Sequence, residues 1–65
     1  MIRVTRLGGG EFILNADLIE SIEKTPDTVV TLTSGRKYVL TEPIDVLLAR
    51  ITEYRKKLGS LSFSE

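Results

Sequence analysis

The 65-residue chain contains no cysteine, no histidine and no tryptophan. Without cysteine there are no disulfide bridges, and without both cysteine and histidine there is no ordinary structural zinc site. The most common general base and the thiol nucleophile of enzymes are also missing. A serine nucleophile would need a lysine as its base, and Lys24 and Lys37 are both expected to be exposed. We therefore expect no enzymatic activity, no cofactor and no metal.

Neither sign of charge is in excess, because nine Lys and Arg balance nine Asp and Glu. A nucleic-acid-binding domain usually carries a basic excess that neutralises phosphates, so nucleic acid is disfavoured as a partner. No apolar run approaches the roughly 18–20 residues that span a bilayer. The N-terminus alternates apolar and polar residues and lacks the continuous apolar stretch of a signal peptide. These features predict a cytoplasmic protein without direct membrane insertion.

The chain is also too short to build a large core. A domain of this size buries only about 60% of the surface that its unfolded chain exposes. Small domains without disulfides or metals often rely on very regular packing or on self-association. We therefore expect a homo-oligomer.

The first forty residues alternate apolar and polar side chains between frequent turn signals, a pattern typical of a small antiparallel sheet. Gly8-Gly9-Gly10 predicts a tight hairpin turn, because glycine tolerates positive φ. It does not predict a phosphate-binding loop, since neither a helix start nor a Lys-Ser/Thr pair follows. Two further turns are predicted: a type I turn over Thr25–Thr28 and a two-residue hairpin turn at Ser34-Gly35.

The segment around Asn15-Ala16-Asp17 allows two interpretations. Asn15 could cap a short helix that carries Leu18, Ile19 and Ile22 on one face. Alternatively, the Asn and Asp side chains close a single turn onto the backbone and a strand begins near Leu18. The strand is favoured, because a ten-residue helix is marginal alone and the following segment has the pattern of a hairpin partner.

The periodicity changes after Glu42-Pro43, where Pro43 suits the first position of a helix. Apolar residues then recur at steps of three and four and form one stripe: Ile44, Leu47, Leu48, Ile51, Tyr54 and Leu58. Arg55, Lys56 and Lys57 suit the last turn, and Gly59 predicts the helix end.

The predicted fold is α+β: a small, twisted, mainly antiparallel sheet of four or five short strands with one C-terminal amphipathic helix. Residues 1–58 form the single domain and 59–65 a flexible C-terminal tail, although Leu61 and Phe63 alternate and could pair with a sheet edge.

Two groups of charged residues are candidate binding sites. Arg3, Arg6, Arg36 and Lys37 make two strands mildly basic, and the neighbouring Tyr38 can stack a base, although a lone tyrosine is more often a packing residue. Asp17, Glu20 and Glu23 would share one side of a helix, but on a strand the two glutamates fall on opposite faces. A hard cation usually needs more converging oxygens than these.

Several blocks of this sequence resemble the flagellar FlbD family, also called the swarming motility protein SwrD family. The most specific are Leu14–Glu20 and Thr25–Thr28, and the likeness extends from Met1 to Leu58. The other matching residues are Thr5-Arg6-Leu7, Glu11-Phe12, Ile22-Glu23, Thr31-Leu32, Gly35, Lys37-Tyr38-Val39 and Glu42. Gly8-Gly9-Gly10 departs from the family's frequent Asn-Gly turn, so any contact from an asparagine side chain there is lost.

The resemblance implies a bacterial cytosolic protein that supports flagellar motility and swarming, as an accessory factor that promotes motor torque or stator function through protein–protein contacts. Its implied setting is the periphery of the flagellar motor at the inner membrane, and its partners are flagellar motor or stator components. A small nucleic-acid-binding regulator of gene expression is the alternative. Carried over by position, the candidate partner-binding residues are Arg6, Asn15, Asp17, Glu20, Glu23 and Asp27.

Overall fold

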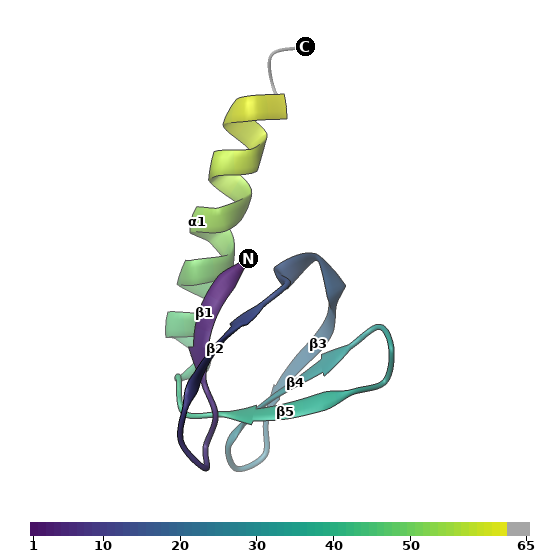
Figure 1. Cartoon of the computed structure of the whole chain (residues 1–65), viewed down its shortest axis with the longest axis vertical. Coiled ribbons are helices and arrows are strands. Elements are labelled where there is room, and N and C mark those ends of the chain that lie inside the picture. Colours follow the sequence, from purple (N-terminus) through teal and green to yellow (C-terminus); the bar gives the residue numbers. More distant parts are fainter. Residues whose placement is uncertain (63–65) are drawn as a thin grey trace.

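Five short strands precede one long C-terminal helix, and a single helical turn interrupts the strands (Figure 1). The computed structural model describes the backbone of residues 1–62 and the side chains of residues 1–57. The elements are β1 (Ile2–Thr5), β2 (Glu11–Leu14), the 3₁₀ turn η1 (Ala16–Leu18), β3 (Ile19–Lys24), β4 (Thr28–Leu32), β5 (Lys37–Leu40) and α1 (Ile44–Ser62). The α+β class predicted from the sequence is confirmed, with five strands.

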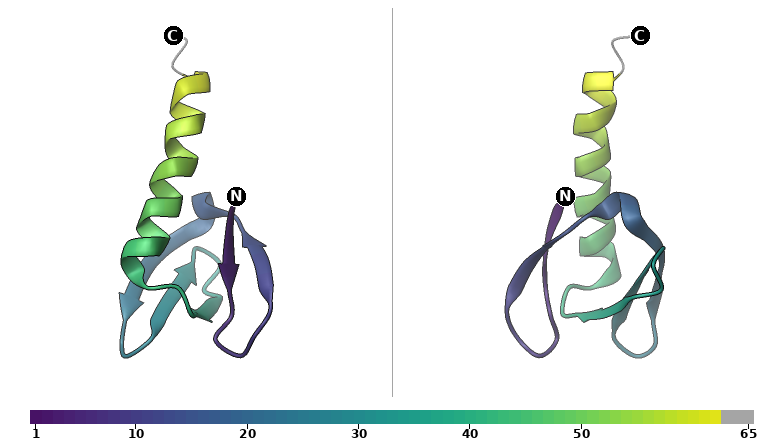
Figure 2. Two further views of the ribbon diagram at one scale, coloured as in Figure 1. Left: turned by 90° about the vertical axis from the view of Figure 1, so that its left-hand side faces the viewer. Right: turned by 45° about the vertical axis from the view of Figure 1, so that its right-hand side comes forward.

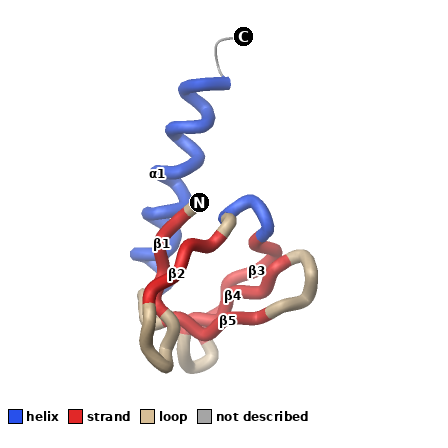
Figure 3. The backbone as a smooth tube through the Cα atoms, viewed as in Figure 1, coloured by secondary structure: helices blue, strands red, loops and turns tan. Residues whose placement is uncertain are grey.

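The strands form two antiparallel sheets, β1-β2 and β3-β4-β5, where the sequence predicted one. The sheets are joined where the chain leaves β1: Arg6 forms an isolated bridge with Leu40. There the N–H of Leu7 donates to the carbonyl of Val39 at 2.9 Å, and the N–H of Thr41 donates to the carbonyl of Thr5 at 2.9 Å. The two sheets therefore curl around a common interior (Figure 3).

Glycines with positive φ lie in two of the hairpin turns. Gly9 and Gly10 have φ of 110° and 97°, values that favour glycine, and the N–H of Arg6 donates to the carbonyl of Gly10 at 3.0 Å. The predicted first hairpin is confirmed. The hairpin at Ser34-Gly35 is also present, but its loop has three residues instead of two, because the N–H of Leu32 donates to the carbonyl of Arg36.

The loop between β3 and β4 also differs from its predicted form. Lys24 pairs with Thr28, and the N–H of Thr25 donates to the carbonyl of Asp27 at 3.0 Å. The predicted hairpin is therefore present, with residues 25–27 as its loop instead of a type I turn closed between Thr25 and Thr28.

The segment after β2 combines parts of both interpretations. Asn15 Oδ1 accepts a hydrogen bond from the N–H of Asp17 at 3.0 Å and so caps η1. The turn ends at Leu18, and β3 begins at Ile19. The favoured prediction of a strand is confirmed. The physical reason is that an isolated helix of about ten residues is marginally stable, whereas an extended chain here can pair with β4.

Helix α1 starts one residue after Pro43, whose carbonyl accepts the N–H of Leu47 at 3.0 Å. The predicted end at Gly59 is wrong, since the helix continues to Ser62 and includes Leu61, which forms no strand. One glycine costs a helix only about 1 kcal/mol and does not by itself terminate it. Arg55, Lys56 and Lys57 therefore lie before the last turn. Figure 2 shows the C-terminal half of α1 extending beyond the sheets.

The core lies between the two sheets and the first half of α1. Its buried apolar residues are Ile2, Val4, Leu14, Ala16, Val30, Leu32, Leu40, Leu47 and Ile51. Leu48 belonged to the predicted apolar stripe, yet its side chain is 49% exposed, so the buried face of the helix is narrower than predicted. The side chains of Leu58 and Leu61, and all of Phe63, lie outside the described residues.

Candidate partner-binding surface

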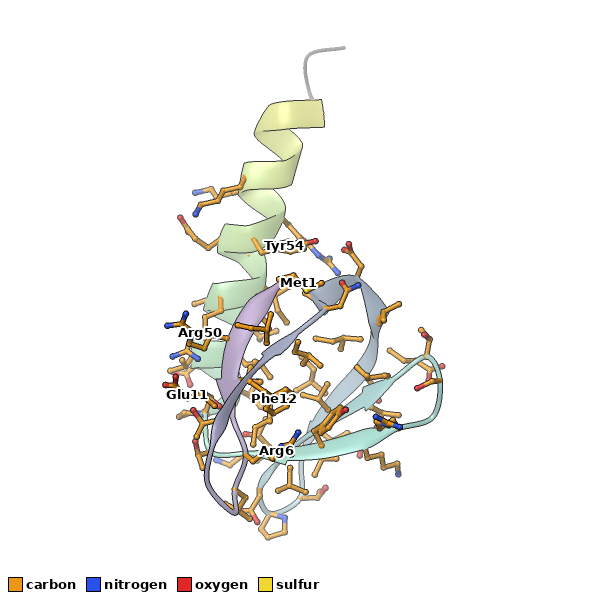
Figure 4. All side chains as sticks on the ribbon, viewed as in Figure 1. Met1, Arg6, Glu11, Phe12, Arg50 and Tyr54 are labelled. Carbon is orange, nitrogen blue, oxygen red and sulfur yellow. The ribbon has the colours of Figure 1, made fainter. Side chains whose placement is uncertain are left out.

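Arg6 lies over two aromatic rings at the junction of the sheets. Its guanidinium carbon is 4.5 Å from the centre of the Phe12 ring and 5.7 Å from the centre of the Tyr38 ring. The two rings are themselves in contact, with centroids 5.0 Å apart and planes tilted by 45°. These are cation–π distances, and Figure 4 shows Arg6 beside Phe12. An exposed arginine is thus held in one position by rings from β2 and β5.

The strand registers explain this arrangement. Ile2 and Val4 of β1 are buried, and Arg6 continues the same alternation. Phe12 pairs with Val4, so its side chain is a diagonal neighbour of Arg6 on that face. Tyr38 stands two residues before Leu40, the bridge partner of Arg6, and is the diagonal neighbour from the other sheet.

A second arginine reaches the same tyrosine. Arg36 Nη1 donates to the Tyr38 hydroxyl at 3.4 Å, and this hydrogen bond is the main cause that raises the pKa of Arg36. Arg6 and Arg36 are both exposed. Among the side chains of residues 1–57, neither arginine forms an ion pair with a carboxylate, whereas Arg50 does. We call Arg6, Phe12, Arg36 and Tyr38 the arginine–aromatic cluster.

A polar network around the buried carboxyl of Glu42 holds β1, and with it Arg6, in place. Glu42 is only 8% exposed, and its Oε1 accepts the N–H of Thr5 at 3.0 Å. Its Oε2 lies 2.9 Å from Arg50 Nη1, which also donates to the carbonyl of Arg3 at 2.7 Å. The Thr28 hydroxyl donates to the carbonyl of Glu42 at 2.7 Å. The network therefore connects β1, β4 and α1.

The carboxyl of Glu42 stays ionised in spite of its burial. Burial, the largest single influence, raises the pKa of Glu42, but hydrogen bonds to its carboxyl from Thr5, from its own backbone and from Arg50 together outweigh it. The pKa of Glu42 therefore lies below its ordinary value of 4.5.

Two of the six predicted site residues serve the fold directly. Asn15 caps η1, as described above. Asp17 is exposed and its Oδ2 accepts a hydrogen bond from the Tyr54 hydroxyl of α1 at 3.0 Å. This hydrogen bond raises the pKa of Tyr54, because it stabilises the protonated phenol. Asp17 therefore ties η1 to the helix.

Glu20 and Glu23 are exposed on β3, and the prediction that they lie on opposite faces is wrong. The register of β3 against β4 shifts between Ile19 and Ser21, which inserts Glu20 as an extra residue. The shift reverses the alternation, so Ile19 and Ile22 both pack against the core although they are three residues apart. Each glutamate follows one of these isoleucines and faces solvent.

Asp27 lies in the loop between β3 and β4 and is not part of the arginine–aromatic cluster. It lines a surface cavity of about 290 Å³ together with Leu7, Lys24 and Pro43. A second cavity, of about 250 Å³, lies between β1 and α1 and is lined by Met1, Arg50 and Tyr54, which Figure 4 labels. The predicted residues are thus spread over the molecule, and only Arg6 belongs to the arginine–aromatic cluster.

Sequence reasoning missed Phe12 and Arg50 and gave Glu42 no role. Phe12 could have been found, since alternation and the glycine turn place it diagonal to Arg6. Glu42 and Arg50 carry no local signal, because both act on β1 across sequence separations of 37 and 47 residues.

The side chains of residues 1–57 include no cluster of three or more acidic residues that could hold a metal ion. Within the described part of the chain, no helix is both long enough and apolar enough to cross a membrane. The arginine–aromatic cluster consists of two exposed guanidinium groups in contact with the side chains of Phe12 and Tyr38. The fold and this cluster define a small α+β protein with an exposed arginine–aromatic cluster where its two sheets meet.

The chain belongs to the FlbD family of flagellar and swarming motility proteins, whose model matches residues 1–59. This confirms the resemblance and its extent, and it assigns the protein a role in flagellar and swarming motility. Comparison with curated proteins and with solved structures found no match.

Proposed function

We propose that this protein is a non-enzymatic accessory factor of the flagellar motor, which promotes torque or stator function through contacts with motor components. The motility role comes from the family. The contact mechanism is supported above all by the arginine–aromatic cluster, in which two exposed arginines lack a carboxylate partner among the described side chains. Arginine and aromatic residues are enriched where proteins bind each other.

The proposed place of action is the cytoplasmic side of the motor, at the inner membrane, where a small protein would reach motor components without entering the bilayer. The balance of nine basic and nine acidic side chains supports a protein partner over a polyanion.

Deleting the gene in its native host is expected to lower the torque of tethered cells and to impair swarming, with flagella still assembled. Wild-type protein supplied from a plasmid should restore both. The Arg6→Ala variant should restore less torque than wild type, whereas Arg3→Ala should restore it fully, because Arg3 lies on the neighbouring strand β1 and contacts neither ring. Normal torque and swarming in the deletion strain would contradict the motor role.

We further propose that the protein self-associates. Strands β2 and β3 each pair with only one neighbour among the described residues, and Ile13 on β2 is 55% exposed. Unpaired strand edges are templates for pairing with a second chain. Light scattering of the purified protein is expected to give a mass that is a multiple of the 7.3 kDa chain. A mass equal to one chain at the highest concentration measured would refute self-association.

A further inference from the structure

We infer that the arginine–aromatic cluster is an anchor for an acidic segment of the partner protein, with Arg6 and Arg36 each receiving a carboxylate. The inference deepens the proposed function and rests on it, because it specifies the chemistry of the partner's contact. Two features of the cluster carry it: Arg6 is positioned in advance, and a second arginine without a carboxylate partner among the described side chains, Arg36, contacts the same tyrosine.

Arg6 is positioned before any partner arrives. Its guanidinium lies on the rings of Phe12 and Tyr38, at 4.5 and 5.7 Å from their centres. A free arginine loses considerable rotamer freedom on binding, and a stacked one loses less. The cation–π contacts use none of the hydrogen bonds of the guanidinium, so its N–H groups are left for a carboxylate in the bidentate geometry that arginine favours.

Arg36 adds a second cation beside the same ring. It donates one hydrogen bond to the Tyr38 hydroxyl and, like Arg6, forms no ion pair among the described side chains. Arg50, by contrast, pairs with Glu42. The other basic side chains of residues 1–57 also form no ion pair, so the cluster is distinguished by the placement of two guanidinium groups against one tyrosine.

Charge complementarity alone would also admit a nucleic acid, but the geometry disfavours it. Proteins that bind single strands stack bases on open aromatic faces. Here Arg6 already lies against the rings of both Phe12 and Tyr38. A chain with no net charge also lacks the broad basic surface that neutralises several phosphates. A protein segment rich in Asp or Glu fits two arginines better.

The test uses the full-length, ¹⁵N-labelled protein and acetylated hexaglutamate as the probe, followed by NMR. Hexaglutamate is expected to shift the Nε–Hε signals of Arg6 and Arg36 and the amide of Tyr38 more than those of Arg3. Arg6→Lys keeps the charge but loses the planar fork and the stacking, and should weaken binding by on the order of tenfold. Arg3→Lys, the matched change on strand β1, should weaken it less than about twofold.

Equal loss of binding in Arg6→Lys and Arg3→Lys, or equal shifts at all basic residues, would overturn the anchor, since only non-specific attraction would remain. Tighter binding of a ten-nucleotide oligouridylate, lost in Arg6→Lys, would also overturn it and assign the cluster to nucleic acid. The gene deletion keeps the two proposals apart. Reduced torque on deletion without hexaglutamate binding refutes the anchor alone. Site-specific binding together with normal torque supports the anchor and refutes the motor role.

Discussion

Replacing Glu42 by alanine is expected to lower the free energy of unfolding by about 2–3 kcal/mol. The change removes the acceptor of the Thr5 N–H and the ion partner of Arg50. Breaking a fully buried ion pair costs about 3–5 kcal/mol. The lower figure applies here because the Arg50 side chain is 43% exposed and can turn to water once its partner is gone.

Urea unfolding of Glu42→Ala, Glu42→Gln and the wild type measures this effect. Glutamine keeps an oxygen for the Thr5 N–H, so it should retain part of the stability. Glu53→Ala is the control, because Glu53 is an exposed glutamate of α1 that takes no part in the network. If Glu42→Ala and Glu53→Ala unfold at the same urea concentration, the network does not stabilise the fold.

The same network predicts how stability depends on acid. The pKa of Glu42 is lower in the folded protein than its ordinary value of 4.5. The unfolded chain therefore takes up this proton at a higher pH than the folded chain does, and protonation favours unfolding. The stabilisation is fully present above about pH 4.5 and is lost as the pH falls through the folded pKa. In Glu42→Gln this part of the acid dependence should disappear.

The network has a topological reason. The end of β5 is hydrogen-bonded to the end of β1 through Thr5, whose carbonyl accepts the N–H of Thr41. Beyond that point, Glu42 accepts the Thr5 N–H and Arg50 donates to the Arg3 carbonyl, as a neighbouring strand would. Two side chains thus satisfy a strand edge that would otherwise pair with another chain. The same two side chains hold β1, the strand that directly precedes Arg6, in place.

Local patterns predicted most of the fold. Alternation of apolar residues placed the strands, and the glycines placed two of the hairpin turns, because both signals act within a few residues. The helix followed from the three-and-four spacing of Leu47, Ile51 and Tyr54. The helix end was mispredicted at Gly59 because a glycine permits a stop without requiring one.

The site was harder to predict because it depends on pairing between distant segments. Arg6 was a candidate through its place in a matching family block, yet its contact with Tyr38 depends on the bridge to Leu40, 34 residues away. No local pattern specifies that pairing. Similarly, the bulge at Glu20 is what brings Glu20 and Glu23 to the same face, and a regular two-residue alternation cannot reveal it.

The largest single loss of stability is expected from Leu47→Ala. Leu47 is fully buried on α1, in the core between the helix and the sheets. Truncating a buried leucine to alanine costs about 2–5 kcal/mol, because transfer free energy is lost and a cavity remains. Domains have a total stability of roughly 0.05–0.15 kcal/mol per residue, which is about 3–10 kcal/mol for this chain. The variant should therefore lose much of its stability, seen as a large drop in the unfolding temperature measured by circular dichroism.

The adjacent Leu48 provides the matched control, since it is the same residue type on the same helical turn but is 49% exposed. Leu48→Ala is expected to change the free energy of unfolding by less than about 0.5 kcal/mol. Because helix propensity changes equally in the two variants, their difference isolates burial from helix formation. Equal destabilisation by the two changes would mean that Leu48 is covered in solution, and self-association through this side of α1 would then explain it. A much larger loss of unfolding free energy in Leu47→Ala than in Leu48→Ala would establish that the sheets cover the Leu47 side of the helix and leave Leu48 exposed.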